Sequence, residues 1–127
     1  MSTEYVSKDK SAKQFRILRD AEVIVTDEYT TTNSFADLVG AIIDAANYES
    51  LAIIFKNTGG TNGASWEILG SIDGTTYVEV VASANVAAGA TGTPYTVSNP
   101  PYRYYKVRAK SQSAGNHTTA VAHIIGK

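Results

Sequence analysis

Residues Tyr102 to Lys110 read YRYYKVRAK, and this stretch decides the fold class. Side chains of an extended chain point alternately to the two faces of a sheet. The alternation separates Arg103, Tyr105, Val107 and Ala109 on one face from Tyr104, Lys106, Arg108 and Lys110 on the other. One set is mostly apolar and the other polar, which predicts a strand with one face in a core.

The sequence upstream of this strand continues the same pattern. Residues 51–56, LAIIFK, carry apolar side chains on both faces, which predicts a buried strand ended by the turn residues of 57–63. Residues 66–72 predict another strand, with Trp66, Ile68 and Ile72 sharing a face. Asp73-Gly74 is a strong hairpin signal, and the two threonines that follow could lengthen the loop before a return strand at 77–81.

The flanking segments also favour strands. Residues 16–32 predict one long strand or a bent pair, and residues 119–125 a terminal strand. Residues 82–93 are small and predict a loop or an edge strand. Pro94, Pro100 and Pro101 exclude long central strands in their region.

The segment from Ser34 to Ala46 supports two predictions. Its apolar residues fall at helical spacing, and Ser34 with Asp37 could form a capping box. Gly40 and the β-branched residues around it favour a strand at 40–44 instead.

Strands separated by frequent turn signals, without βαβ alternation, predict an all-β chain. We expect an antiparallel β-sandwich of the jelly-roll kind, with at most one short helix near residues 34–46. A length of 127 residues fits one domain. We assign residues 15–127 to it and residues 1–14 to a flexible N-terminal arm, which could instead order on a neighbouring subunit.

Composition excludes several functions. A net charge of −1 argues against a nucleic-acid partner, because phosphate binding needs surplus Lys and Arg. The absence of cysteine excludes disulfides and thiolate metal sites. The polar N-terminus lacks the apolar stretch of a signal peptide, and no apolar run is long enough to span a membrane. We therefore expect synthesis in the cytoplasm and no membrane partner.

No catalytic pattern is recognisable. The sequence lacks the Gly-x-Ser-x-Gly elbow and the phosphate-binding loop motif. Its two histidines, His117 and His123, are expected in a turn and in a strand at an edge or interface, without carboxylates spaced to complete a metal site. Its acidic residues are scattered singly. We predict a non-enzymatic protein without metal or cofactor.

The outer face of the 102–110 strand is the candidate site. Tyr102, Tyr104, Lys106 and Arg108 are expected to share it, and tyrosine and arginine are frequent in interface hot spots. The same aromatic rings could instead stack on a sugar. Trp66 and Tyr77 could do so as well, or simply fill the core.

Several stretches resemble small virion proteins of phages. They are GAIID at 40–44, YESLAI at 48–53, the hairpin SIDGTTYVEV at 71–80, and the strands YRYYKVR at 102–108 and TAVA at 119–122. The resemblance covers residues 40–125 and implies a head-decoration, minor capsid or tail-associated β-sandwich. It supplies no catalytic residues.

We therefore expect a self-associating structural subunit of a phage-type virion, assembled in the host cytoplasm. Its expected partners are copies of itself and other virion proteins. The rival hypothesis is a carbohydrate- or receptor-binding module that uses exposed aromatic residues on a glycan.

Overall fold

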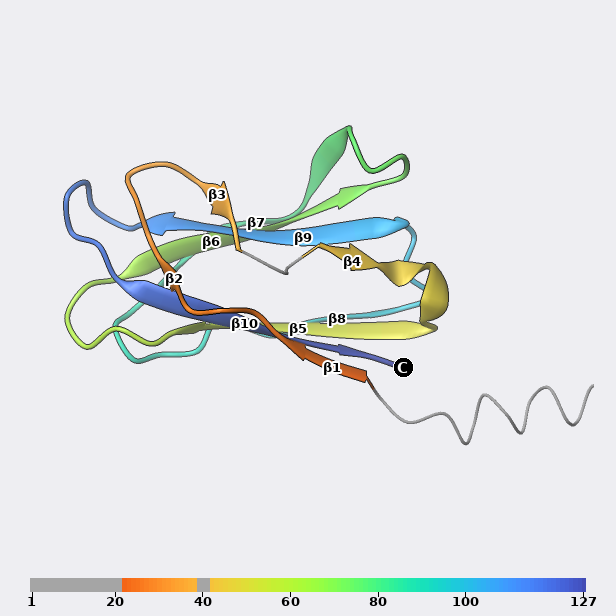
Figure 1. Cartoon of the computed structure of the whole chain (residues 1–127), viewed down its shortest axis with the longest axis horizontal. Helices are drawn as coiled ribbons and strands as arrows, with labels where there is room; N and C mark the ends of the chain where they lie inside the picture. Colours follow the sequence, from red (N-terminus) through yellow and green to blue (C-terminus); the bar gives the residue numbers. More distant parts are fainter. Residues whose placement is uncertain (1–21, 39–41) are drawn as a thin grey trace, which may run out of the picture.

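The computed structural model describes residues 22–38 and 42–127, which form two antiparallel sheets packed face to face (Figure 1). The predicted arm at 1–14, and its boundary with the domain, lie outside the described residues. The architecture confirms the predicted β-sandwich.

The lower layer in Figure 1, which we call sheet A, has the order β1-β10-β5-β8, with β2 also paired to β10. Its strands are β1 (Glu22–Val25), β2 (Tyr29–Thr30), β5 (Ser50–Asn57), β8 (Tyr95–Ser98) and β10 (Thr119–Gly126). The upper layer, sheet B, has the order β3-β9-β6-β7, with β4 also paired to β9. Its strands are β3 (Ala36–Asp37), β4 (Ile43–Asp44), β6 (Ala64–Ser71), β7 (Tyr77–Val86) and β9 (Tyr104–Ser111).

The strand order is that of a jelly roll. When β1 with β2, and β3 with β4, are treated as interrupted single strands, the chain crosses between sheets at each connection except the β6–β7 hairpin. The sequence predicted this topology because its turn signals separate short strands throughout.

The core lies between the sheets, where alternate residues of each strand meet. In β5 the buried set includes Ile53 and Phe55, and in β9 it includes Tyr105 and Val107. The Phe55 and Trp66 rings stack across the core with centroids 5.2 Å apart. Trp66 therefore fills the core rather than offering a sugar platform.

The buried amide of Asn57 fixes the end of β5. Its Nδ2 donates to the carbonyls of Asn62 and Val86, while its Oδ1 accepts from Gly59 N–H and the Thr118 hydroxyl. A buried polar side chain is tolerated when its hydrogen bonds are made. These bonds hold the turn after β5 against β7 and the approach to β10.

The helical prediction for 34–46 is wrong for its described residues. Two short strands, β3 and β4, pair with β9, and only a single 3-10 turn, η1 (Ala45–Asn47), follows. Asp37, expected in a capping box, lies opposite Arg108 in the β3–β9 ladder. The backbone of β9 needs a partner on this side, and this requirement overrides the helical spacing of the apolar residues.

Two predicted side-chain directions are also wrong. Ile72 does not share the inward face of Trp66, because β6 ends at Ser71 and leaves Ile72 76% exposed. Arg103 precedes β9, and its guanidinium lies 3.3 Å from the Asp44 carboxylate outside the core. Residues 82–86 continue β7, which supports the edge-strand option for this segment.

Candidate interaction surfaces

Three of the four predicted site residues lie on the outer face of sheet B. Tyr104, Lys106 and Arg108 are half-buried, whereas the residues between them in β9 are buried. The register places this row beside the outward side chains of β6, with Arg108 opposite Glu67 and Lys106 opposite Leu69.

The fourth residue, Tyr102, lies apart from this face. Its ring meets that of Tyr105 edge-on, with centroids 5.9 Å apart, and packs against the core. A Cβ added to Gly70 would come within 2.8 Å of the Tyr102 ring, so glycine there makes room for it. With Ile72 and Val78, Tyr102 lines a hollow of about 310 Å³ beside the β6–β7 turn.

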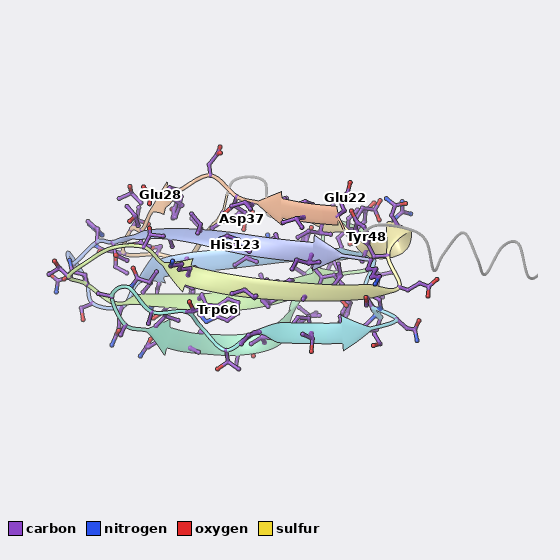
Figure 2. The ribbon with its side chains drawn as sticks, turned by 90° about the horizontal axis from the view of Figure 1, so that it is seen from below. Glu22, Glu28, Asp37, Tyr48, Trp66 and His123 are labelled. Carbon is purple, nitrogen blue, oxygen red and sulfur yellow. The ribbon has the colours of Figure 1, made fainter. Side chains whose placement is uncertain are left out.

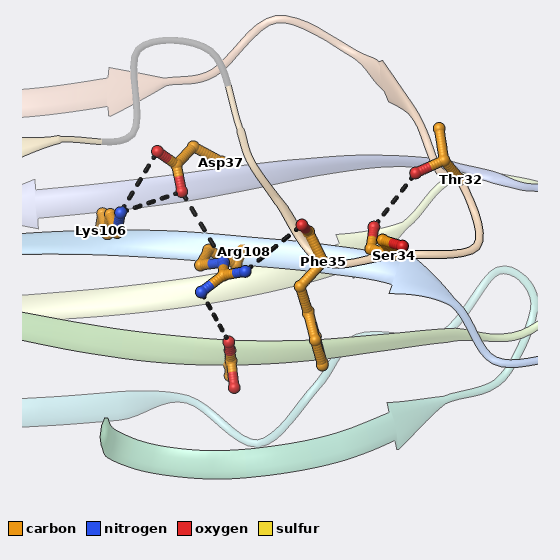
Figure 3. Close-up of polar contacts among 7 residues, drawn as sticks. Thr32, Ser34, Phe35, Asp37, Lys106 and Arg108 are labelled. Carbon is orange, nitrogen blue, oxygen red and sulfur yellow. Dashed lines mark hydrogen bonds and ion pairs between the residues drawn. The ribbon is translucent and has the colours of Figure 1, made fainter. Parts of the chain in front are cut away.

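The charged groups on this outer face are paired within the chain. The Asp37 carboxylate forms ion pairs with the Lys106 ammonium at 3.3 Å and the Arg108 guanidinium at 3.8 Å (Figure 3). The Arg108 guanidinium also lies 3.6 Å from the Glu67 carboxylate. Arg108 Nη2 further donates to the Phe35 carbonyl at 3.3 Å. A contact between Arg108 and a partner would have to compete with these internal bonds.

Aromatic rings complete this network. The Lys106 ammonium lies 4.1 Å from the centroid of the Tyr77 ring, so Tyr77 belongs to the outer face and not to the core. Arg103 lies over the Tyr104 ring at 5.3 Å. The hydrogen bond from Arg103 is also the main reason why the pKa of Asp44 is lowered. Together these contacts fix the charged and aromatic side chains of this face against one another within the chain.

The turn at the end of this face confirms the hairpin signal. Gly74 has a φ of +82°, which glycine adopts without strain. Asp73 Oδ1 accepts from the backbone N–H groups of Thr75 and Thr76 at 2.9 and 2.8 Å, and from the Ser71 hydroxyl. These hydrogen bonds hold the pKa of the Asp73 carboxyl well below its usual value.

The outer face of sheet A has the opposite character; Figure 2 views the molecule from this side, with His123 of β10 labelled. Most outward positions of its three adjacent strands β1, β10 and β5 carry apolar side chains, with one histidine among them, namely Val23, Val25, Ala52, Ile54, Val121, His123 and Ile125. Val23 and Val25 are 60% and 54% exposed, and the others are half-buried. We call this set the apolar face. Lys56, exposed and level with Val121, adds one charge at the end of β5.

Sequence reasoning did not single out the apolar face. The signal was present, because LAIIFK and the terminal strand both carry apolar residues at successive positions. For LAIIFK the pattern predicts burial on both faces, and for residues 119–125 it predicts only a strand. His123 lies within this face on β10, between β1 and β5, which excludes the edge option, while its expected position at an interface stays a prediction. His117 is exposed, and its Nδ1 is 2.7 Å from the Ser111 hydroxyl.

Across residues 22–38 and 42–127, no three His, Cys, Asp or Glu side chains gather into a group that could hold a metal ion. The same part of the chain contains no helix with the length and apolar character needed to cross a membrane.

Comparison with known proteins finds structures that share the fold but assigns the chain to no family. No family model and no curated protein matches the sequence. Among solved structures, it is similar to a protein of the disulfide-linked pili of Bacillus endospore appendages, with a TM-score of 0.51, 19% identity, and coverage of 85% of this chain and 87% of that one.

Two further structures share the fold. The SPBc2 prophage-derived protein YomS gives a TM-score of 0.53 at 6% identity, covering 84% of this chain and 94% of that one. The Yersinia pseudotuberculosis-derived mitogen gives 0.54 at 10% identity, covering 84% and 86%. A prophage-derived structure is thus among the proteins that share this fold.

Proposed function

We propose that this chain is a non-enzymatic structural subunit that associates with copies of itself in a phage-type particle, as a decoration or minor virion protein. Its site of action would be the virion, after assembly in the host cytoplasm. Its partners would be its own copies and other virion proteins.

The apolar face of sheet A is the observation that carries this proposal. Its β-branched side chains meet water across neighbouring strands, and burial of apolar surface is favourable by roughly 25 cal/mol per Å². A contiguous exposed apolar patch on a soluble chain marks a contact site. One modest contact, repeated around an assembly, accumulates through multivalency.

The fold comparison supports the same role at a coarser level. A prophage-derived protein and a pilus protein share the fold, although a shared fold alone does not assign a function. The pili are described as disulfide-linked, whereas this chain contains no cysteine. Association of its copies would therefore be non-covalent.

Sedimentation of the purified full chain over a wide concentration range tests the proposal. We expect a mass that rises with concentration and persists in high salt, because screening weakens exposed ion pairs but not apolar contacts. Electron micrographs of the concentrated protein should show regular assemblies. A chain that stays monomeric at every concentration would contradict the proposed function.

A glycan- or receptor-binding role is the second candidate, favoured by the hollow that Tyr102 lines with Ile72 and Val78. An aromatic ring beside a hollow can stack on a sugar. Binding on a glycan array that is lost in Tyr102→Ala, together with a monomeric wild type, would select this candidate.

A further inference from the structure

One row of the apolar face is asymmetric in side-chain size. Pairing across sheet A places four outward residues level with one another, in the order Val23, Ile125, Ala52 and Thr96. The first two, on β1 and β10, are large, and the last two, on β5 and β8, are small. Val23, on the edge strand β1, is 60% exposed, whereas Ile125 is half-buried.

The small half is hollowed. A shallow depression of about 310 Å³ lies there, and its lining includes Ala52, Thr96, Ser98 and Ile125. The row therefore has larger side chains on β1 and β10, and a depression beside the smaller side chains of β5 and β8.

Resting on the proposed function, we propose that a second copy packs its apolar face on this one about a two-fold axis that runs parallel to the strands, between β10 and β5. Such a rotation turns the two faces together and exchanges the two halves of the row. Val23 of each copy then lies over Thr96 of the other, and Ile125 lies over Ala52. Large side chains meet small ones, as in a well-packed core.

The size of the face suits this partner. Strands about 4.8 Å apart with a rise of about 3.3 Å per residue give the four-strand face a projected area on the order of 500 Å². Two stacked copies would then cover roughly 1,000 Å², near the lower limit of specific interfaces. Valine and isoleucine are stiff at χ1, so they lose little rotamer freedom on packing.

The charge pattern favours a second copy over the N-terminal residues as the occupant. The central positions of the face, at Ile54, His123 and Ile125, carry no acidic side chain. Residues 13–19 read KQFRILR, which places basic residues among the apolar ones. Covering the face with that stretch would bring three cations onto apolar surface, whereas a second copy brings one, Lys56, at the end of the face level with Val121.

Thiol cross-linking tests this arrangement, because the natural chain has no cysteine to interfere. Val23→Cys and Thr96→Cys full-length chains, one with a tag that changes its mass, are mixed and treated with a short bis-maleimide. We expect a cross-linked species that contains one copy of each variant. Val23→Cys alone should give none, because β1 of each copy lies over β8 of the other.

The controls separate the possible failures. Val23→Cys mixed with Thr75→Cys, whose thiol lies in the β6–β7 turn, should not cross-link. Cross-linking by Val23→Cys alone would place β1 over β1 and overturn the proposed axis. An intramolecular product of a Phe15→Cys/Thr96→Cys chain would overturn the second copy as occupant.

Sedimentation of the wild type separates this inference from the proposed function. If the wild type associates but the Val23→Cys and Thr96→Cys mixture stays unlinked, this interface is wrong while the proposed function stands. A monomeric wild type would overturn both.

Discussion

The two outer faces of the sandwich differ in what their side chains contact. On sheet B, Lys106 and Arg108 are paired with carboxylates of the same chain, and Tyr77 lies against Lys106. On sheet A, Val23 and Val25 meet water with no described element above them. On a face rich in tyrosine and arginine, the polar groups can thus already be paired within the chain. A face of valine and isoleucine exposes apolar surface, and its burial by a partner would be favourable.

The largest effect should come from the turn at the end of the sheet B face. Gly74→Val should lower the free energy of unfolding by about 1 to 3 kcal/mol, because a β-branched residue is strained at positive φ. The new side chain would also press on the Tyr104 ring, which lies 3.3 Å from an added Cβ. Chemical denaturation measures the change.

Gly60→Val is the matched control for this turn. An added Cβ there meets nothing within 4 Å, and its φ lies outside the left-handed region. Equal losses from both substitutions would show that the Gly74 turn has no special requirement for glycine.

Arg108→Ala should have the next largest effect on folding, about 1 to 2 kcal/mol, because it leaves the 9%-exposed Glu67 without its cation. Lys110→Ala is its control on the same strand face, since that ammonium only lies over the Phe35 ring at 5.2 Å. If the midpoint of urea denaturation is unchanged in Arg108→Ala, the network on sheet B is not holding the fold and the contrast between the faces weakens.

A smaller effect should appear in acid. The folded-state pKa of Asp73 is depressed below its ordinary value of 3.8, so its stabilising contribution is present above about pH 4 and is lost progressively as the pH falls below that value. Asp73→Asn should be less stable than the wild type at neutral pH, with a difference that shrinks in acid. Thermal unfolding at several pH values checks this, and parallel curves would exclude the carboxylate as the cause.

Much of the fold was predictable because local pattern and tertiary structure agree. The clean alternation of β9 placed Tyr105 and Val107 in the core, and Asp73-Gly74 marked the hairpin. The segment at 34–46 was predictable only in part. The β-branched residues indicated the strand option at 40–44, which agrees with β4 at Ile43–Asp44, whereas the helical spacing is overridden by backbone pairing to β9.

The candidate surfaces were predictable only in part. Alternation placed Tyr104, Lys106 and Arg108 on an outer face, but the internal partner Asp37 comes from a strand about seventy residues away. Tyr102 lies off this face because it precedes β9 and its ring packs beside Gly70. The apolar face was missed because a strand that is apolar on both sides looks the same whether a neighbour covers it or not.

The central claim is that association uses the apolar face more than the face around Tyr104 and Arg108. Sedimentation equilibrium of Val25→Lys beside the double variant Tyr104→Ala/Arg108→Ala tests it most directly. A lysine buried in an apolar contact should weaken association by about tenfold or more. The double variant should weaken it less, because Arg108 is already paired with Asp37 and Glu67 within the chain. Unchanged association in Val25→Lys, with dissociation of the double variant, would contradict the account.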